Sequence, residues 1–436
     1  MKKLFPLASL AIFLLLMSAC QKDSCEQTWT QLATVPVTLD RQAVQDSIEA
    51  QGPREFCTGG NLYAYGNYLF VNLPRKGYHV LDNADKSNPT PVGFLQIPGA
   101  TNMAFVDGRM ISDSYADLLV LDFQSHTELE LLSSTENFLL EATGFEIPGT
   151  EVAIGFEQRE VTFTQACDGN VTGRWGGGWE EDALFSADRN SGGGGIGTPN
   201  VNTAGSLARM AFCDRSLYVL GNSQLSTYSL TNSDELLNTN NTPMNWGQEA
   251  LIRRGDFLYV ASTSALEIYD IADCDVPTRL GTAPHRWARD PVAVEGNRAV
   301  LTTRWGNPDD GNPDDGSSGG EIMVFDITDR TNPELLRRHA MTFPVGIAMH
   351  EGTVYVCDEV DGLRVFDFST ELSGGLDRHE IERHEDDGVV DVAVLPYASG
   401  TTLLTIGGER LRQYAHQDGG ALDQLVSLEV EPCAAL

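Results

Sequence analysis

The chain has 436 residues, of which 62 are acidic and 29 basic, so its formal net charge is −33. This excess of carboxylates repels nucleic acid and anionic lipid, and we expect neither as a partner. Beyond residue 19 the only lysines are Lys22, Lys76 and Lys86. A chain so rich in acid and poor in lysine resembles proteins of salt-loving bacteria, which concerns habitat and leaves activity open.

Residues 1–19 predict an export signal. Lys2 and Lys3 precede an apolar run over 4–17, and "MSAC" places small residues before Cys20. The run is too short to span a membrane comfortably, and no other segment approaches eighteen apolar residues. The ending resembles the lipobox of bacterial lipoproteins, which implies cleavage before Cys20 and its acylation. An ordinary secretory signal is the alternative.

This leader predicts the location of the protein. Several acyl chains on Cys20 would hold the chain stably on a membrane. Gln21, where Asp would signal retention, favours the outer membrane by analogy with enterobacterial sorting. We therefore expect an exported, membrane-anchored lipoprotein on the periplasmic or surface face of the cell envelope.

Seven cysteines remain once Cys20 is assigned to lipid, and an exported location permits disulfides. Because seven is odd, at least one is unpaired. Cys357 lies in the strand-like run "TVYVCDEVDG" and is expected to be a small buried apolar residue. Fifteen pairings are open to the other six, which are Cys25, Cys57, Cys167, Cys213, Cys274 and Cys433.

An apolar strand that ends in Asp recurs along the chain. Its clear copies are "YHVLD", "LLVLD", "LEIYD", "IMVFD" and "LRVFD", which end at Asp82, Asp122, Asp270, Asp326 and Asp367. Weaker copies end at Ser229 and Ala415. Most intervals lie near 40 to 48 residues, the period of a four-stranded propeller blade.

Each copy has the same internal order of four strands with short polar turns, and the Asp-terminated strand is third. Helical periodicity is nearly absent, except in parts of the N-terminal tether and in "NSDELLNT" near Glu235. In "DITDRTNP" the carboxylate of Asp326 can accept backbone N–H bonds just ahead. This turn role explains the repeated Asp; a functional carboxylate is the alternative.

The stretches "GYHVLDNADKSNP", "EIMVFDITDRTNP" and "GLRVFDFS" resemble the LVIVD repeat of bacterial exported proteins. The resemblance covers most of 61–430 and implies a lipid-anchored, repeat-only protein without an assigned reaction. Repeated four-stranded units bury both faces by closing into a ring. We therefore expect an all-β fold, a β-propeller of seven four-stranded blades, with six or eight blades as alternatives.

The expected organisation is a signal peptide at 1–19, a tether and lead-in strand at 20–55, the propeller at 56–431 and a tail at 432–436. The last strand, "QLVSLEV", is expected to close the ring against N-terminal chain such as "LATVPVTL". Insertions are predicted at about 141–204 and 304–320. The first could contain an extra hairpin from "EVAIGFEQREVTFT" or a concealed eighth blade, and the second separates strands two and three of blade five.

Motifs that suggest chemistry have simpler explanations. "SGGGGIG", with Gly192, Gly194 and Gly197, lacks the strand and helix that a dinucleotide site requires. "HEIERH" (379–384) spaces its histidines five apart, one more than a zincin helix needs, and falls where a fourth strand belongs. His285 and His350 are expected to be isolated, and no cluster has zinc-like spacing. "DEVDG" (358–362) is expected to form the turn between strands two and three.

The tandem "NPDDGNPDDG" is the candidate for a metal site. It brings four carboxylates into ten residues, and flexible acidic loops can bind calcium weakly. The EF-hand spacing is absent, so a solvated acidic loop is the alternative. Calcium is the one cofactor the sequence suggests, through Asp309, Asp310, Asp314 and Asp315.

Two Arg-Trp pairs in blade five, Arg286 with Trp287 and Arg304 with Trp305, are the candidates for a binding surface. Arg and Trp are favoured at binding hot spots, but cation–π packing within the blade would explain them equally well. No catalytic or cofactor-binding residue can be assigned, since no nucleophile elbow or paired Cys and His stands out.

We therefore expect a monomeric, lipid-anchored β-propeller that acts as a non-catalytic binding or scaffolding module for an envelope protein or glycan. The repeats carry structural residues and no shared catalytic set. The alternative is a propeller enzyme, a hydrolase or lyase, with its site over the central channel.

The lipid anchor predicts a specific loss. A Cys20→Ser variant has no thiol to acylate, so it should leave the detergent phase in a two-phase partition, where the wild-type chain is recovered. A variant that still partitions with detergent would contradict the anchor.

Overall fold

A computed structural model describes residues 26–58, 61–138, 147, 149–166, 171–172, 202–204, 208–221, 223–244, 247–285, 291–305, 319–369, 379–385, 388–397, 400–407, 409–417 and 419–432. Nearly all of these residues belong to strands or short turns. The one helix among them is α2 (Arg41–Asp46), which the carboxylate of Asp40 caps by accepting the N–H of Ala43 at 2.8 Å. Within this part of the chain, no helix has the length and apolar character to cross a membrane.

The chain divides into two units, Met1–Val37 with Phe156–Glu180 and Thr38–Gly155 with Glu181–Leu436. In the first unit β1 (Glu26–Asp40) pairs with β12 (Glu151–Ala166), and β13 (Val171–Thr172) pairs with the end of β12. The hairpin predicted within "EVAIGFEQREVTFT" is wrong, because this stretch is a single strand of β12. Alternating polarity identifies a strand but not its partner.

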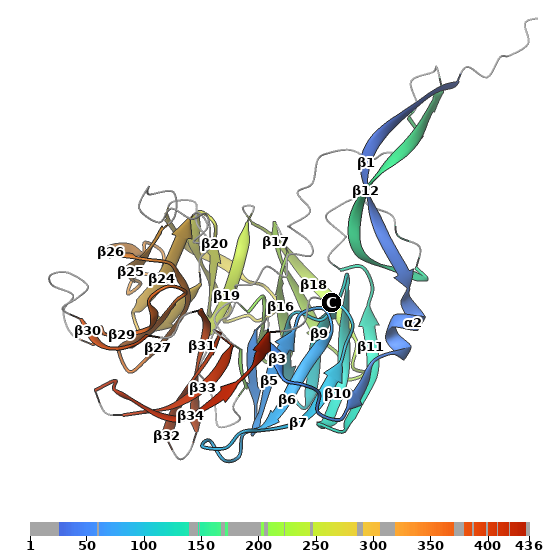
Figure 1. The fold of residues 1–436 in the computed structure, drawn as a ribbon. Helices are drawn as coiled ribbons and strands as arrows, with labels where there is room; N and C mark the ends of the chain where they lie inside the picture. Colours follow the sequence, from blue (N-terminus) through green and yellow to red (C-terminus); the bar gives the residue numbers. More distant parts are fainter. Residues whose placement is uncertain are drawn as a thin grey trace, which may run out of the picture. The chain divides into compact units, whose positions relative to one another are not determined.

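The described residues of the second unit form seven antiparallel sheets, numbered 1 to 7 along the chain, each built around four consecutive strands (Figure 1). Sheet 1 has β4 (Leu62–Tyr65), β5 (Tyr68–Leu73), β6 (Gly77–Asp82) and β7 (Thr90–Gln96). Sheet 2 has β8 (Met103–Val106), β9 (Arg109–Ser114), β10 (Asp117–Ser125) and β11 (Glu128–Thr135). Sheet 3 has β15 (Met210–Cys213), β16 (Ser216–Leu220), β17 (Gln224–Leu230) and β18 (Leu236–Pro243).

Sheets 4 to 7 continue the same order along the chain. Sheet 4 has β19 (Gln248–Arg254), β20 (Phe257–Ser262), β21 (Ala265–Asp270) and β22 (Thr278–Pro284), and sheet 5 has β23 (Val292–Glu295), β24 (Arg298–Trp305), β25 (Gly319–Asp326) and β26 (Glu334–Met341). Sheet 6 has β27 (Pro344–His350), β28 (Thr353–Asp358), β29 (Gly362–Asp367) and β30 (Glu380–His384). Sheet 7 has β31 (Val389–Tyr397), β32 (Gly400–Gly407), β33 (Arg410–His416) and β34 (Leu422–Glu429).

Seven clusters of buried apolar side chains join each sheet to the next. The cluster between sheets 1 and 2, for example, combines Tyr63 and Phe70 with Phe105 and Leu119. The last cluster brings sheet 7 back to sheet 1. The sheets therefore form a closed ring, and the prediction of an all-β propeller with four-stranded blades is confirmed.

The ring closes without exchanging a strand between the two ends of the chain. All four strands of sheet 7 are consecutive, and β34 pairs with β33. The predicted pairing of "QLVSLEV" with "LATVPVTL" is wrong, because the latter lies in β1, beside β12. Closure comes from side-chain packing and from β3 (Cys57–Thr58), which pairs in parallel with β35 (Glu431–Pro432).

The first strands of the sheets line the axis of the ring. β8, β15, β19, β23, β27 and β31 contact one another in succession, and β31 also contacts β4. Fourth strands lie outside, as the mostly exposed residues of β26 show. Sheet 1 carries two further strands: β2 (Glu49–Gln51) beside β7, and β14 (Asn202–Ala204) beside β4. β14 also contacts β8 and β31, so the chain after the first long insertion returns along the axis.

Every predicted copy of the repeat falls on the third strand of its own sheet. The second insertion separates β24 from β25, the second and third strands of sheet 5, as predicted. One local expectation is wrong: "NSDELLNT" contains no helix. A tight turn from Thr231 to Glu235 leads instead into β18, in which Leu236 is buried and the other residues are exposed or half-buried.

The repeated Asp residues hold the turn after the third strand, as the sequence predicted. The N–H two residues ahead donates to the carboxylate at 2.8–2.9 Å after Asp82, Asp270, Asp326 and Asp367. A second Asp three residues later repeats the bond in three of these turns, at Asp85, Asp273 and Asp329. Hydrogen bonds from the side chain and N–H of Thr328 lower the pKa of Asp326.

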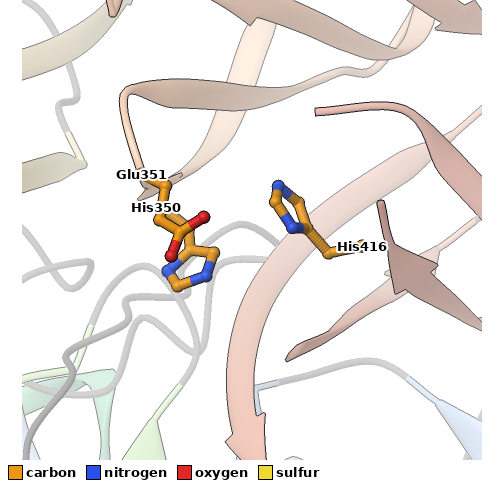
Figure 2. A group of neighbouring side chains, drawn as sticks. All are labelled: His350, Glu351 and His416. Atoms are coloured by element: carbon orange, nitrogen blue, oxygen red, sulfur yellow. The ribbon is translucent and has the colours of Figure 1, made fainter. Parts of the chain in front are cut away.

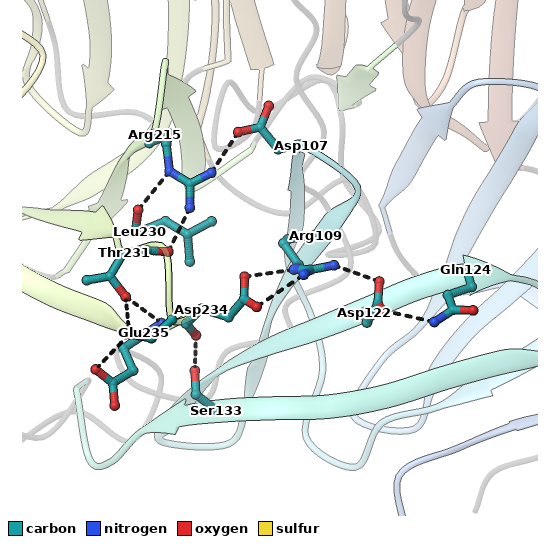
Figure 3. A network of polar contacts seen from close by, with 11 residues as sticks. Asp107, Arg109, Asp122, Gln124, Ser133, Arg215, Leu230, Thr231, Asp234 and Glu235 are labelled. Carbon is teal, nitrogen blue, oxygen red and sulfur yellow. Dashed lines mark hydrogen bonds and ion pairs between the residues drawn. The ribbon is translucent and has the colours of Figure 1, made fainter.

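Asp122, in the copy without an Asn-Pro turn, has a different role (Figure 3). Its carboxylate accepts Nη1 of Arg109 at 2.8 Å, while Nε and Nη2 of Arg109 donate to Asp234 of sheet 3 at 2.8 and 3.1 Å. The Arg109 guanidinium thereby holds the pKa of Asp234 below its ordinary value. Here the repeated acid helps to join two sheets rather than to shape a turn.

The Arg109 bridge predicts a pH-dependent loss of stability. Arg109→Ala should lower the free energy of unfolding by about 1–2 kcal/mol at neutral pH, because three charge-assisted hydrogen bonds are lost. Since Asp234 has a lowered pKa in the folded state, its contribution is full above its ordinary pKa of 3.8 and disappears as the pH falls through the lowered value. The difference between wild type and variant should therefore shrink in acid.

Urea unfolding followed by fluorescence at neutral and acidic pH measures this effect. Arg410→Ala is the matched control, because its ion pair with the exposed Glu429 spans 4.0 Å and should contribute little. Equal losses in the two variants would contradict the bridge.

Candidate functional site

The ring has two faces, which we name from their turns. The Asp-turn face carries the turns after the first and third strands, including those at Asp82, Asp270, Asp326 and Asp367. The opposite face carries the turns between second and third strands and the connections between sheets. At the opposite face the chain leaves β24 and returns at β25, and it enters β15 after the first insertion. Both insertions therefore attach there.

Arg209 lies at the opposite face, directly before the axial strand β15. Its side chain is half-buried, and Nη2 is 3.4 Å from the carbonyl oxygen of Leu220 and 3.5 Å from that of Gly221. Burial lowers the pKa of Arg209, while the carboxylates of Glu249 and Asp113 act in the other direction. Arg209 is therefore held by backbone carbonyl groups beside the axial strand.

Asp113, at the end of β9, is committed to a local structural role. Its carboxylate accepts the N–H groups of Thr101 and Asn102 at 2.6 and 2.8 Å, Nδ2 of Asn102 at 3.2 Å, and the hydroxyl of Thr101. Burial raises the pKa of this carboxyl, and these hydrogen bonds partly oppose the increase. Both oxygens hold the connection from sheet 1 to sheet 2, so Asp113 is a poor candidate for a general base.

Asp358 has the same role between sheets 5 and 6. Its carboxylate accepts the N–H of Phe343 at 2.9 Å and those of Val360 and Asp361 at 3.1 Å, which confirms "DEVDG" as the turn between β28 and β29. Burial raises its pKa, and the backbone hydrogen bonds act against the rise. Asp113 and Asp358 are therefore both held mainly by backbone N–H groups.

The sequence-predicted binding residues are only partly within the described chain. Arg304 is 5% exposed, and its guanidinium carbon lies 5.4 Å from the ring centroid of Phe343, which precedes β27. It therefore packs between sheets 5 and 6 through a cation–π contact, whereas the alternative to binding had been such packing within its own blade. Trp305 is the last residue of β24. The other candidates lie outside the described residues: Cys20, Arg286, Trp287, Asp309, Asp310, Asp314 and Asp315.

The cysteines follow part of the prediction. Cys357 is buried and unpaired, and burial raises the pKa of its thiol, so it acts as a small apolar residue as expected. Cys213 of β15 and Cys274 form a disulfide whose Cα atoms are 5.5 Å apart. Cys274 lies in the turn after β21, so the disulfide joins sheets 3 and 4.

One group of side chains was missed by sequence reasoning (Figure 2). Ligand atoms of His350, Glu351 and His416 all lie within 4.8 Å of one another on the Asp-turn face. The expectation that His350 is isolated is therefore wrong. His416 is far away in sequence and on another sheet, so only the register of both sheets could have revealed the group. The "HEIERH" segment, by contrast, is strand β30, as predicted.

Comparison with known proteins places the repeat in a family. A family model described as LVIVD repeat matches residues 59–95, so the chain contains an LVIVD repeat, in agreement with the resemblance of its sequence. No curated protein matches the chain in sequence.

Solved structures resemble the chain in fold. A candidate 6-phosphogluconolactonase from Bacteroides uniformis is 12% identical and has a TM-score of 0.53, with 88% of this chain and 97% of that one covered. A second, from Bacteroides fragilis, is 12% identical with a TM-score of 0.50 and coverages of 89% and 96%. BamB from Moraxella catarrhalis is 8% identical, with a TM-score of 0.46 and coverages of 89% and 99%. At these identities the likeness concerns the fold alone.

The position of Arg304 predicts a stability effect. Arg304→Ala should lower the free energy of unfolding by about 2 kcal/mol, because it removes both the packing of the side-chain stem and the contact with Phe343. Arg304→Lys should lose less, since it keeps a stem and a cation. Urea unfolding tests the order, and two variants with wild-type stability would show that Arg304 is free for another role.

Proposed function

We propose that this LVIVD-repeat propeller is an exported, lipid-anchored protein of the cell envelope that acts as a monomeric, non-catalytic binding or scaffolding module. Its ligand would be an envelope protein or a glycan. The observation that carries the proposal is the use of the repeated acids. Asp82, Asp270, Asp326 and Asp367 each accept a backbone N–H of their own turn, so the residues that the sheets share maintain the scaffold.

The opposite face is the better binding face. Two connections on the opposite face carry long insertions that the other connections lack. The Asp-turn face, by contrast, repeats one turn design around much of the ring. Loops on a rigid scaffold are common sites of recognition. Val360, an apolar side chain on the turn between β28 and β29, is 48% exposed there.

An exported location is supported by the chemistry of the chain. The Cys213–Cys274 disulfide suits an oxidising compartment such as the periplasm. The leader with Cys20 supplies the route and the anchor in this proposal. A net charge of −33 would keep such a protein soluble and repel anionic surfaces, leaving the acyl chains as the attachment to the outer membrane.

The enzyme alternative places a site over the central channel, and two observations count against it. β14 occupies the axial side of sheet 1 and contacts β8 and β31, so chain fills part of that space. Asp113 and Asp358 are held by backbone N–H groups. A general acid or base must instead be able to reach a substrate proton.

Site-specific photo-crosslinking tests the proposed binding face. A photoreactive residue at Val360, in the full-length anchored protein, should give one crosslinked product of fixed size in intact envelopes. Val276 is the matched control, because it is a similarly exposed valine, 53% against 48%, on the Asp-turn face. Mass spectrometry of the product distinguishes a protein partner from a glycan.

Two results would contradict the proposal. Identical products from both positions would mean that the contacts are nonspecific, and no product from position 360 would mean that this face binds nothing in the envelope. Replacement of 306–318 by a Gly-Ser linker of equal length should reduce the specific product, since that insertion attaches at the same face.

A further inference from the structure

We propose that His350, Glu351 and His416 bind one divalent transition-metal ion, with zinc as the best match, where sheets 6 and 7 meet on the Asp-turn face. This site is separate from the proposed binding face, which lies at the other end of the sheets. The inference depends on the arrangement of the three side chains and of the groups that hold them.

The three residues come from two strand ends. His350 is the last residue of β27 and Glu351 begins the turn into β28, whereas His416 is the last residue of β33. The imidazole centroids are 5.1 Å apart, with 76° between the ring planes. The ligand atoms lie within 4.8 Å of one another. Tetrahedral zinc with bonds of about 2.0–2.1 Å needs ligand atoms about 3.3 Å from one another, and small rotations of the side chains can shorten the present separations to that distance.

The environment of His350 favours metal binding. Its Nε2 lies 3.1 Å from the hydroxyl of Thr401 on β32. Its Nδ1 is buried and has no hydrogen-bond partner among the residues that the structure describes. If Nε2 carries the proton and donates to Thr401, Nδ1 presents a lone pair. Metal-binding histidines typically have the second ring nitrogen held in this way, and a bound ion would satisfy the buried atom.

Glu351 is positioned by its backbone rather than by its side chain. It has a left-handed φ of 48°, and its N–H and that of Gly352 both donate to the carboxylate of Glu295 on sheet 5, at 2.8 and 2.7 Å. The carboxylate of Glu351 is exposed, so a fourth ligand position could face water. The site would thus be organised by three neighbouring sheets.

The surroundings also favour a cation over neutral packing. A second carboxylate, that of Glu295 on sheet 5, lies beside the site, where it accepts the N–H groups of Glu351 and Gly352. The ring of Tyr355 packs near His416, with centroids 6.2 Å apart. Two imidazoles with one carboxylate select zinc, copper, nickel or iron over calcium and magnesium, which prefer oxygen alone.

Calorimetry with zinc chloride tests the site. The full-length chain would be purified in detergent with a tag that lacks histidine and freed of metal with a chelator. Wild type should bind one zinc ion per chain. Glu351→Gln should weaken binding at least tenfold, and His350→Gln or His416→Gln about 100-fold. His126→Gln, a substitution at a half-buried histidine on sheet 2, is the control and should leave binding unchanged.

A second measurement separates coordination from a structural effect. Cobalt(II) in the site should give visible absorption bands of a four-coordinate ion, and these bands should be lost in Glu351→Gln. Because Glu351 is exposed, this variant should keep the circular dichroism spectrum of the wild type. Absence of zinc binding by the wild type, equal binding by wild type and the Glu351 and histidine variants, or a preference for magnesium would each overturn the proposal. Crosslinking at position 360 is independent of these results.

Discussion

Burial of apolar side chains between neighbouring sheets is the constraint on which the rest of this molecule depends. A four-stranded sheet has two faces and cannot cover both alone, so each of the seven sheets needs a neighbour on either side. The seven clusters supply this, and the one that contains Leu62 and Leu404 joins sheet 7 to sheet 1. The fixed order of the sheets then determines which turns share a face, and so which residues can act together.

Within this ring, carboxylates do several kinds of structural work. Asp326 and its counterparts accept a backbone N–H in a turn, Asp113 and Asp358 hold connections between sheets, and Asp122 joins Arg109 in a bridge to sheet 3. In so acidic a chain, composition cannot distinguish these roles from a functional one, but the hydrogen-bond partners can. Residues that perform none of these tasks, such as Glu351, are the informative ones.

The sequence predicted what is local and repeated. Strand alternation and the Asp-ended third strand located the seven sheets of the described chain, and turn chemistry explained Asp326 from the sequence. Pairings between distant segments were harder to predict. The segment "LATVPVTL" has the alternation of a strand, but that alternation does not show whether its partner is β34 or β12. His350 and His416 were missed for the same reason, since they meet only through the packing of sheets 6 and 7. Arg304 was noticed for its residue type, but its burial depends on Phe343 from the next sheet.

The packing of the last sheet against the first has a consequence for the timing of folding. Leu62, Leu69 and Val71 are made early, whereas the side chains that cover them, such as Leu395 and Leu404, lie near the C-terminal end of the chain. Until sheet 7 has been made, one apolar side of sheet 1 has no partner, and exposed surfaces of this kind attract chaperones or aggregate. The newly made chain therefore needs protection until its final sheet is complete, and that sheet determines when the protection can end.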